Sequence, residues 1–450
     1  MPEFDGNEKK KEEVFAGPRE SLPVYATSIG WATGRSSIFT FLSYFGVVVG
    51  ASPGEMSILV SVRNLGANIF QGIWGWLADL KGRRLVIMIG LVALAISTFM
   101  APFVNSPFEL VLLSLVMTSV GFAIIPAFNA FLGDYSFEKT RASFIGFVNS
   151  IGTYLSIFTI FIMGVLMDSL GLPFPDLESL GTSFPESKPV FFIPFFGATI
   201  LFSGTIIASF FLVEKYDVRK KVLDEQELKP SWKTLVNRNK PFKRLLPIDA
   251  FFKFTMSTAW PIFPYVALSV SDSWLTVAIM WIVFNLPRGF GQNIGGVLAD
   301  RYNKKTVLWI SRLGYAVVPL FYALGLVTND PLYLIIGAFP GGLAFGAEET
   351  SLATYSLDCS TEETKARYYS ILLTAEGVTA TLGSLFSGFL MQLLLVLFGD
   401  GAFFVILFSL LLFIGLLRFV SAMLHAFIYK NPLDFQLENQ IGKSNYLGEN

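Results

Sequence analysis

The sequence predicts an all-α polytopic membrane protein, with twelve transmembrane helices in two pseudo-symmetric bundles of six. Three observations support this fold class. Hydrophobic residues make up 53% of the 450 residues and charged residues only 15%, whereas soluble domains carry about 25% charged residues. Apolar runs of about 20 residues, each long enough to cross a bilayer as a helix, recur along the chain. One short motif occurs twice, at an offset of 221 residues.

The first bundle is predicted over residues 24 to 213. It follows a charged tail, 1 to 23, which lacks a cleavable signal pattern, so we expect the first helix to act as its own insertion signal. The last two helices are separated by a segment rich in Pro, Gly, Ser and acids, from Asp168 to Pro189, which should be irregular. The six apolar runs are 24 to 49, 54 to 78, 84 to 104, 108 to 133, 142 to 166 and 190 to 213.

The second bundle is predicted over residues 244 to 428 and follows a basic linker, 214 to 243. Within the linker, Ser231 can cap a short helix that places Trp232 and Leu235 on one face. Such a helix would lie on the inner membrane surface, and a disordered basic linker is the alternative. The runs are 244 to 269, 274 to 299, 306 to 328, 331 to 357, 367 to 398 and 402 to 428, and a tail occupies 429 to 450.

The distribution of basic residues predicts the orientation in the membrane. Of the 33 Lys and Arg residues, 26 fall in the two tails and in the loops that follow even-numbered helices, counting with the loops the basic residues that begin the next helix. Because such residues gather on the cytoplasmic side, both termini should be cytoplasmic, and the protein should be a multi-pass protein of the cell membrane. Cys359 is the only cysteine, so an intramolecular disulfide is impossible.

Two repeats relate the halves. Gly75-Trp76-Leu77-Ala78-Asp79 recurs as Gly296-Val297-Leu298-Ala299-Asp300, and the basic pair that follows each copy lies in the same register. Gly82 corresponds to Asn303, and both residue types tolerate a left-handed turn. A second repeat, which begins at Asp134 and Asp358, is offset by 224 residues. The two bundles should therefore share one orientation, as parallel repeats about an axis along the membrane normal.

With these motifs the chain resembles the major facilitator superfamily (MFS) of secondary transporters, whose signature follows its second helix. The resemblance covers all twelve helices. It implies that the motif latches the two halves together on the cytoplasmic side in the outward-open state, the first copy more strictly than the second. The alternative is that the basic residues only enforce topology and the acids cap the next helix. The gate residues implied are Gly75, Asp79, Gly82, Arg83, Arg84, Gly296, Asp300, Lys304 and Lys305; Leu80 replaces the family's usual arginine.

Charged residues within the predicted helices are candidates for the transport site. A charge at the centre of a spanning helix costs about 2.5 to 3.5 kcal/mol, so it usually faces a polar cavity. With a rise of 1.5 Å per residue, Arg288 lies about 18 Å from Asp300 and Lys253 about 14 Å from Arg244, which puts both near mid-membrane. The cavity residues expected are Arg35, Arg63, Lys253 and Arg288, with the polar Asn64, Gln71, Asn285 and Gln292 at helical spacing.

Three acids at comparable depth, Glu348, Glu349 and Glu376, are candidates for proton coupling, because a carboxyl group in a low-dielectric cavity exchanges its proton readily when its surroundings change. Adjacent Glu348 and Glu349 cannot point the same way, so we expect at most one to be central. The alternative is that all these charges form interhelical ion pairs, with Asp249 and Lys253 paired at i, i+4. Arg418 should snorkel from the last helix, and His425 is a poor candidate for proton relay.

The function expected is secondary active transport by alternating access, as proton-coupled uptake (symport) of a small polar or anionic organic solute. Two alternatives stay open: a proton antiporter that exports drugs or metabolites, and a sensor or scaffold that keeps the fold without transport. The chain contains no phosphate-binding loop, metal cluster or nucleophile motif, so no enzyme activity, cofactor or metal is expected. The expected partners are the solute, a proton and the lipid bilayer; we expect no nucleic acid, and a functional monomer.

Overall fold

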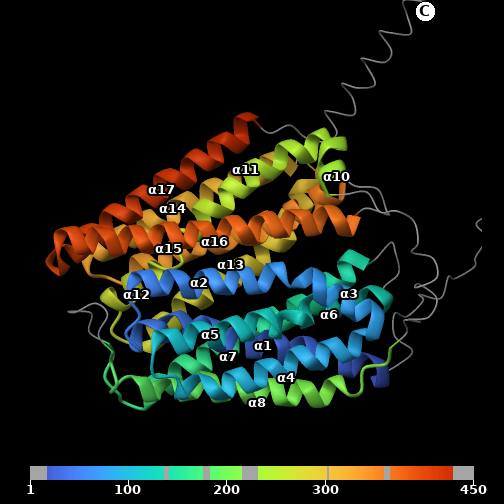
Figure 1. Ribbon diagram of the computed structural model, residues 1–450, viewed down its shortest axis with the longest axis horizontal. Coiled ribbons are helices and arrows are strands. Elements are labelled where there is room, and N and C mark those ends of the chain that lie inside the picture. Colours follow the sequence, from blue (N-terminus) through green and yellow to red (C-terminus); the bar gives the residue numbers. More distant parts are fainter. Residues whose placement is uncertain are drawn as a thin grey trace, which may run out of the picture.

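The computed structural model describes residues 18 to 135, 141 to 175, 183 to 214, 232 to 301, 304 to 358 and 365 to 428. All regular elements within these ranges are helices, and they run along one common direction (Figure 1). The tails, part of the Asp168 to Pro189 segment, most of the linker, and the turns that contain Ser136 and Cys359 lie outside the described residues.

The first bundle consists of helices that match the first six predicted runs. Two of the runs are broken, one at Phe70 and one near Gly121, so that each contains a pair of helices. The helices are α1 (Pro18–Val48), α2 (Pro53–Ile69), α3 (Gln71–Lys81), α4 (Arg83–Met100), α5 (Pro107–Ser119), α6 (Ile124–Tyr135), α7 (Arg141–Ser169) and α8 (Phe192–Ser209).

The second bundle matches the other six runs. Its first run is broken between Ser257 and Phe263, around Pro261, whose nitrogen has no hydrogen to donate. The helices are α11 (Lys240–Ser257), α12 (Phe263–Val270), α13 (Trp274–Arg301), α14 (Lys304–Thr328), α15 (Leu332–Asp358), α16 (Lys365–Phe398) and α17 (Phe403–Ile428).

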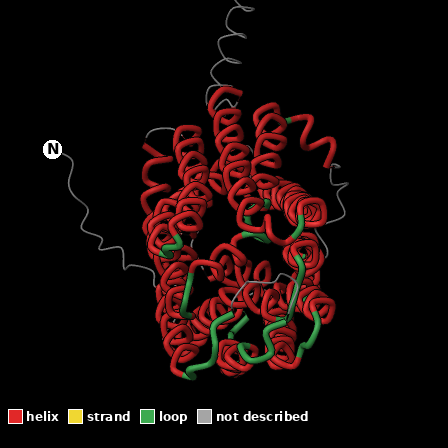
Figure 2. Tube along the Cα trace, turned by 90° about the vertical axis from the view of Figure 1, so that its left-hand side faces the viewer, coloured by secondary structure: helices red, strands yellow, loops and turns green. Residues whose placement is uncertain are grey.

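The two bundles lie side by side, with α2 packed against α16 and α7 against α13 at the boundary. Figure 1 shows α1 to α8 in its lower part and α14 to α17 above them. We call the right-hand end in that view, where α3 ends and α10 lies, the motif end, and the opposite end the loop end. Seen from the loop end, the helices appear nearly end-on (Figure 2).

Seven of the described stretches are long and apolar enough to cross a membrane by length and composition. They correspond to α4, α5 with α6, α7, α8, α14, α16 and α17. The other predicted runs contain α1, α2 with α3, α11 with α12, α13 and α15. These runs are broken in two or carry a charged residue such as Arg35, Lys253, Arg288 or Glu348, which lowers their hydropathy.

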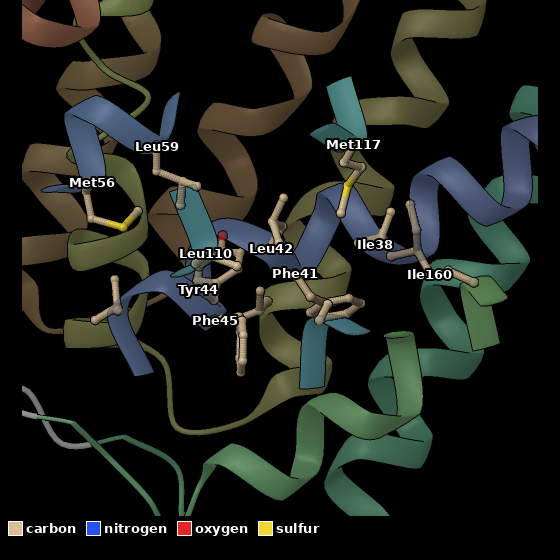
Figure 3. Close-up of a cluster of buried hydrophobic side chains, with 14 of the residues drawn as sticks. Ile38, Phe41, Leu42, Tyr44, Phe45, Met56, Leu59, Leu110, Met117 and Ile160 are labelled. Carbon is tan, nitrogen blue, oxygen red and sulfur yellow. The ribbon is translucent and has the colours of Figure 1, made fainter. Parts of the chain in front are cut away.

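A large apolar core fills the first bundle. In Figure 3, Phe41 and Leu42 of α1 lie among side chains of α2, α5 and α7, including Leu59, Leu110 and Ile160, all of them buried. The branched and aromatic side chains of α1 thus fix its position against three neighbours. This packing places Arg35, two turns from Phe41, at a defined point of the boundary between the bundles.

The linker contains the predicted short helix, α10 (Trp232–Arg238). Leu235 is buried in a core cluster of the second bundle with Phe242 and Leu308. The Tyr368 hydroxyl donates a hydrogen bond of 2.9 Å to the Leu235 carbonyl oxygen. Residues 232 to 238 are therefore helical and packed on the second bundle; Ser231, the predicted cap, lies outside the described residues.

Candidate functional site

Lys253 of α11 joins two carboxylates that come from different helices. Its Nζ lies 3.6 Å from an oxygen of Glu348 on α15 and 3.7 Å from an oxygen of Glu376 on α16. Glu348 is buried, whereas the Lys253 side chain is 22% exposed. Lys253, which the sequence predicts as a cavity residue, thus lies beside Glu348 and Glu376, two of the acids predicted for proton coupling.

Arg312 of α14 extends this group, which we call the buried cluster. Its Nη2 lies 2.5 Å from Asp249 and 3.5 Å from Glu348, and its guanidinium stacks 4.1 Å from the Phe252 ring centroid. Its Nη1 lies 3.2 Å from Nδ1 of His425 on α17, and because a guanidinium only donates, Nδ1 accepts. Asp249 therefore pairs with Arg312, and not with Lys253 at i, i+4 as in the alternative drawn from the sequence, since α14 places this arginine against α11.

The buried cluster contains more carboxylates than cations. Asp249, Glu348 and Glu376 oppose Lys253 and Arg312, which leaves one formal negative charge when all five groups are ionised. Glu376 also lies within electrostatic range of Asp249 and Glu348. An unpaired charge is costly in the interior of a protein. Binding of one proton to one of the three carboxylates would make the buried cluster electrically neutral.

A second group, the boundary cluster, lies between the two bundles. Arg288 of α13 forms an ion pair of 3.0 Å with Glu349, which also accepts a hydrogen bond of 3.1 Å from Gln292. The Arg288 guanidinium lies 4.4 Å from the centroid of the Phe345 ring. Arg35 of the first bundle lies within electrostatic range of both Arg288 and Glu349.

Two arginines of the first bundle make the boundary cluster positive. The exposed Arg35 guanidinium lies 5.8 Å from the Trp31 ring centroid and 5.5 Å from that of Phe122. Arg63 lies 5.0 Å from the Phe39 ring centroid, donates a hydrogen bond of 2.9 Å to Ser43, and is near enough to Arg35 to interact electrostatically. Among the described residues, the boundary cluster thus contains three guanidinium groups and the carboxylate of Glu349, which is paired with Arg288.

Glu348 and Glu349 point into different groups, as their adjacency on a helix requires. Glu348 belongs to the buried cluster and Glu349 to the boundary cluster. Each faces its own set of cations, and the roles expected of both residues stay predictions.

Three of the predicted polar residues lie outside both clusters. Asn64 donates to Ser257 at 3.1 Å and Ser384 at 3.4 Å, so it joins α2 to the second bundle. Gln71 and Asn285 donate to carbonyl oxygens one turn back on the chain, those of Ala67 at 2.6 Å and Trp281 at 2.8 Å. Only Gln292 of this set contacts a charged group of either cluster.

At the motif end, the structure describes the turn between α3 and α4. Gly82 has a φ of 100°, which other residues adopt only with strain. The Arg83 side chain donates to the Ala130 carbonyl oxygen, and the Glu214 carboxylate accepts from the backbone N–H groups of Arg83 and Arg84. These contacts are made with the first bundle and with Glu214, the first residue of the linker. Gly75 lies beside Pro126.

Other residues of the motif are described less fully. Lys304 and Lys305 begin α14. The side chain of Asp79, the surroundings of Gly296 and the side chain of Asp300 lie outside the described part of the chain. The latch proposed for these residues stays a prediction.

At the loop end, the two bundles are bonded directly. The Asp168 carboxylate of α7 accepts hydrogen bonds of 2.7 Å and 3.1 Å from the backbone N–H groups of Trp274 and Leu275, and so caps α13 of the other bundle. The Tyr265 hydroxyl donates to the Ala51 carbonyl oxygen at 2.6 Å. The sequence placed Asp168 only at the start of an irregular segment, because the helix that it caps lies 106 residues away.

Arg418 does not snorkel. It is buried and donates to the carbonyl oxygens of Met256 at 2.9 Å and Tyr315 at 3.2 Å. The break after Ser257 frees carbonyl groups of α11 for this contact. The arginine thus joins α17 to the end of α11 and to α14 through their backbone carbonyl oxygens.

Comparison with known proteins decides the family. The model of the Major Facilitator Superfamily matches residues 25 to 252 and 245 to 430, almost the whole chain. The chain belongs to the Major Facilitator Superfamily. It is therefore a multi-pass membrane transporter and no enzyme, and the predicted fold class, with twelve helices in two bundles, is confirmed.

Three relatives show how this chain compares with other proteins. The multidrug resistance protein MdtG of Enterobacter lignolyticus (strain SCF1) is 23% identical over 215 residues, which is 47% of this chain and 43% of that protein. The nucleoside transporter NupG (D323A mutant) has a TM-score of 0.71 at 16% identity, with 91% of this chain and 99% of that one covered. A D-xylose-proton symporter has a TM-score of 0.67 at 12% identity, with 92% and 98% covered. At these identities the solved structures show the fold alone.

Proposed function

We propose that this protein moves a small polar or anionic organic solute across the cell membrane by alternating access, coupled to a proton and in the direction of uptake. The observation that carries the proposal is the boundary cluster, in which Arg288 is paired with Glu349, Arg35 lies within electrostatic range of both, and Arg63 lies within electrostatic range of Arg35. Unbalanced guanidinium groups between the two bundles attract a carboxylate, phosphate or polyhydroxylated solute.

The aromatic rings around the boundary cluster support an organic solute. Trp31, Phe122 and Phe345 line the arginines, and such rings offer flat apolar surfaces beside the charged donors. A few polar groups among aromatic walls are typical of small-molecule sites. Since the arginines come from both bundles, a solute bound to them would contact both bundles, as alternating access requires.

The buried cluster supports proton coupling. Its excess of one carboxylate is balanced by one proton, and Lys253, partly exposed, connects its carboxylates to the boundary between the bundles. When the bundles rearrange, a change in the distance from Lys253 to Glu348 or Glu376 would change which carboxyl holds the proton. We propose Glu348 and Glu376 as the proton-coupling residues, and Glu349 as the partner that holds Arg288 when no solute is bound.

The bonds at the loop end and the contacts of the motif within the first bundle fit a conformation open at the motif end. With both termini cytoplasmic, as the positive residues predict, this is an inward-facing state. We further propose that the protein acts as a monomer, with the bundle limits 24 to 213 and 244 to 428, and that Asp79, Arg83 and Arg84 contact the second bundle when the motif end closes.

Export by proton antiport is the second candidate. It is favoured by the similarity to a relative named as a multidrug resistance protein, over less than half of either chain. The two candidates differ in the direction of solute movement relative to the proton gradient, so one experiment separates them.

The test is transport in proteoliposomes. Labelled carboxylates, sugars, nucleosides and amino acids are screened with and without a pH gradient, and we expect one class to accumulate with the inward proton gradient. The R35Q/R288Q variant should lose at least 90% of that uptake, while R19Q, which removes an exposed charge at the motif end, should keep it. Uptake that does not depend on the pH gradient, or uptake that persists in an E348Q/E376Q variant, contradicts proton coupling. Movement of solute out of loaded vesicles against the solute gradient supports export.

A further inference from the structure

A cavity lies at the motif end between α11 and α17, and reaches the turn of α11 that carries Asp249 of the buried cluster. Its volume is about 540 Å³. One part is lined by basic residues of the first turns of α11, and the rest by apolar side chains of α11 and α17. The lining residues are Lys240, Lys243, Arg244, Pro247, Ile248, Phe251 and Leu424.

The basic part of the cavity concentrates positive charge. Lys240, Lys243 and Arg244 are exposed and lie at the N-terminal end of α11, where the helix dipole is itself positive and the first turn holds no acid. Lys243 donates to the neutral Asn237 side chain at 2.9 Å. None of the ion pairs in the described part of the chain involves Lys240 or Lys243. An anion placed here would interact with the side chains and the helix end together.

The apolar part of the cavity continues toward the middle of the membrane. From Lys240 to Phe251 the helix rises about 16 Å, roughly the distance from a headgroup to the upper half of an acyl chain. Next to Leu424 on the outer side of α17, Phe419, Val420 and Phe427 are exposed, the last by 82%. In a transporter of this fold such a surface faces lipid. The cavity therefore opens onto both the basic helix end and the lipid-facing surface.

We propose that this cavity binds one anionic phospholipid, whose phosphate is contacted by Lys240, Lys243 and Arg244 and whose acyl chain packs against Phe251 and Leu424. A free phosphate ion would use only the basic part and leave the apolar walls uncovered. A zwitterionic lipid would place its own cation beside three protein cations. Basic pockets between helices at the cytoplasmic surface suit anionic headgroups for this reason.

The bound lipid would also stabilise the position of α11, the helix that carries Asp249 and Lys253 of the buried cluster. Ile248 lines the cavity, and the next residue, Asp249, projects about 100° further around α11 and pairs with Arg312. Pro247 weakens the hydrogen bonding of α11 in this turn. A phospholipid bound along the outer face therefore holds the first turns of α11 against α17, independently of which solute is transported.

The test uses the purified full chain in detergent, stripped of lipid and titrated with phosphatidylglycerol or phosphatidylcholine, with bound lipid counted by native mass spectrometry. We expect one tight phosphatidylglycerol per chain and at least tenfold weaker phosphatidylcholine. The K240Q/K243Q/R244Q variant should weaken phosphatidylglycerol binding at least tenfold. The matched control, R19Q/K81Q/K233Q, removes three exposed charges at the same end and should change binding less than threefold.

Two further arms test the apolar walls and the folding of the variants. L424W fills the cavity without a change of charge and should weaken phosphatidylglycerol at least fivefold, whereas the charge-keeping K240R/K243R variant should bind as the unchanged protein does. Glycerophosphoglycerol, the headgroup without chains, should fail to compete. Equal binding of both lipids, equal loss in the control variant, unchanged binding by L424W, or competition by the free headgroup each overturns the proposal.

Discussion

Arg312 is the residue on which the buried cluster depends most, because its guanidinium contacts Asp249, Glu348 and His425 within a fully buried environment. Removal of one partner of a buried ion pair leaves the other charge without compensation, which costs about 3 to 5 kcal/mol. We therefore expect R312Q to lower the stability of the protein by about this amount, measured as thermal unfolding in detergent or as the yield of folded protein.

The control for R312Q is the double variant D249N/R312Q, which removes both charges and should recover at least half of the lost stability. If R312Q and D249N destabilise independently and their effects add, the two side chains do not act as a pair, and the described geometry does not account for their burial.

At the residue scale, the sequence predicted which positions would hold membrane-buried charges but not their partners. The depth of Lys253, Glu348 and Glu376 follows from counting residues along each helix. Whether Asp249 meets Lys253 or Arg312 depends on how α11 and α14 are rotated about their axes, which one sequence does not determine. Arg312 lies eight residues inside α14, and this position within a predicted helix is the feature of the sequence that indicates a buried partner.

The turn between α3 and α4 can be tested as an element. Gly82 has a φ of 100°, and a Cβ there would lie 3.0 Å from the Glu214 carboxylate that caps α4. We expect G82A to cost about 1 to 2 kcal/mol of stability, from strain and from displacement of Glu214. Thermal unfolding measures this cost, and G204A provides the matched control, since Gly204 is helical and has nothing within 4 Å of its Cβ position.

An equal loss of stability in G82A and G204A would mean that the turn is not strained by a side chain. The pairing of Gly82 with Asn303 in the repeat indicated a turn that tolerates positive φ; Gly82 has a positive φ, with a ψ of 145° that lies outside the left-handed helical region. The breaks at Phe70 and Gly121 were not predicted, because neither position carries a proline and the hydrophobic pattern continues through both.

At the scale of the whole molecule, the two bundles and their helices follow from hydrophobic run length and from the repeated motif, and family membership confirms that fold. The sequence does not predict which conformation of the two bundles the structure adopts. The motif predicts a latch; in the described residues the Arg83 side chain donates to Ala130 of its own bundle, and the two bundles are bonded at the loop end. A repeated motif predicts where a gate lies, and does not specify whether that gate is open or closed.

Asp168 therefore offers the sharpest test of alternating access. Its carboxylate bonds two backbone N–H groups of α13 across the boundary, and hydrogen bonds to a charged group are worth about 1.5 to 3 kcal/mol each. In D168A the loop end should open more often. A cysteine placed at the buried Ser57, which packs beside Gly388 of α16, reports this opening through its rate of reaction with a membrane-impermeant maleimide, in a C359S background.

We expect D168A to raise the labelling rate of S57C at least tenfold, and a bound solute to change that rate in the unaltered protein. D272A removes an exposed acid from the neighbouring turn and should leave the rate within twofold, so that a general effect of loop-end charge is separated from loss of the cap. An unchanged rate in D168A would show that the Tyr265 bond and the packing of Trp274 against Phe174 and Phe191 suffice to close the loop end. Opening would then require separation of the aromatic contacts as well, and Asp168 would serve α13 only as a helix cap.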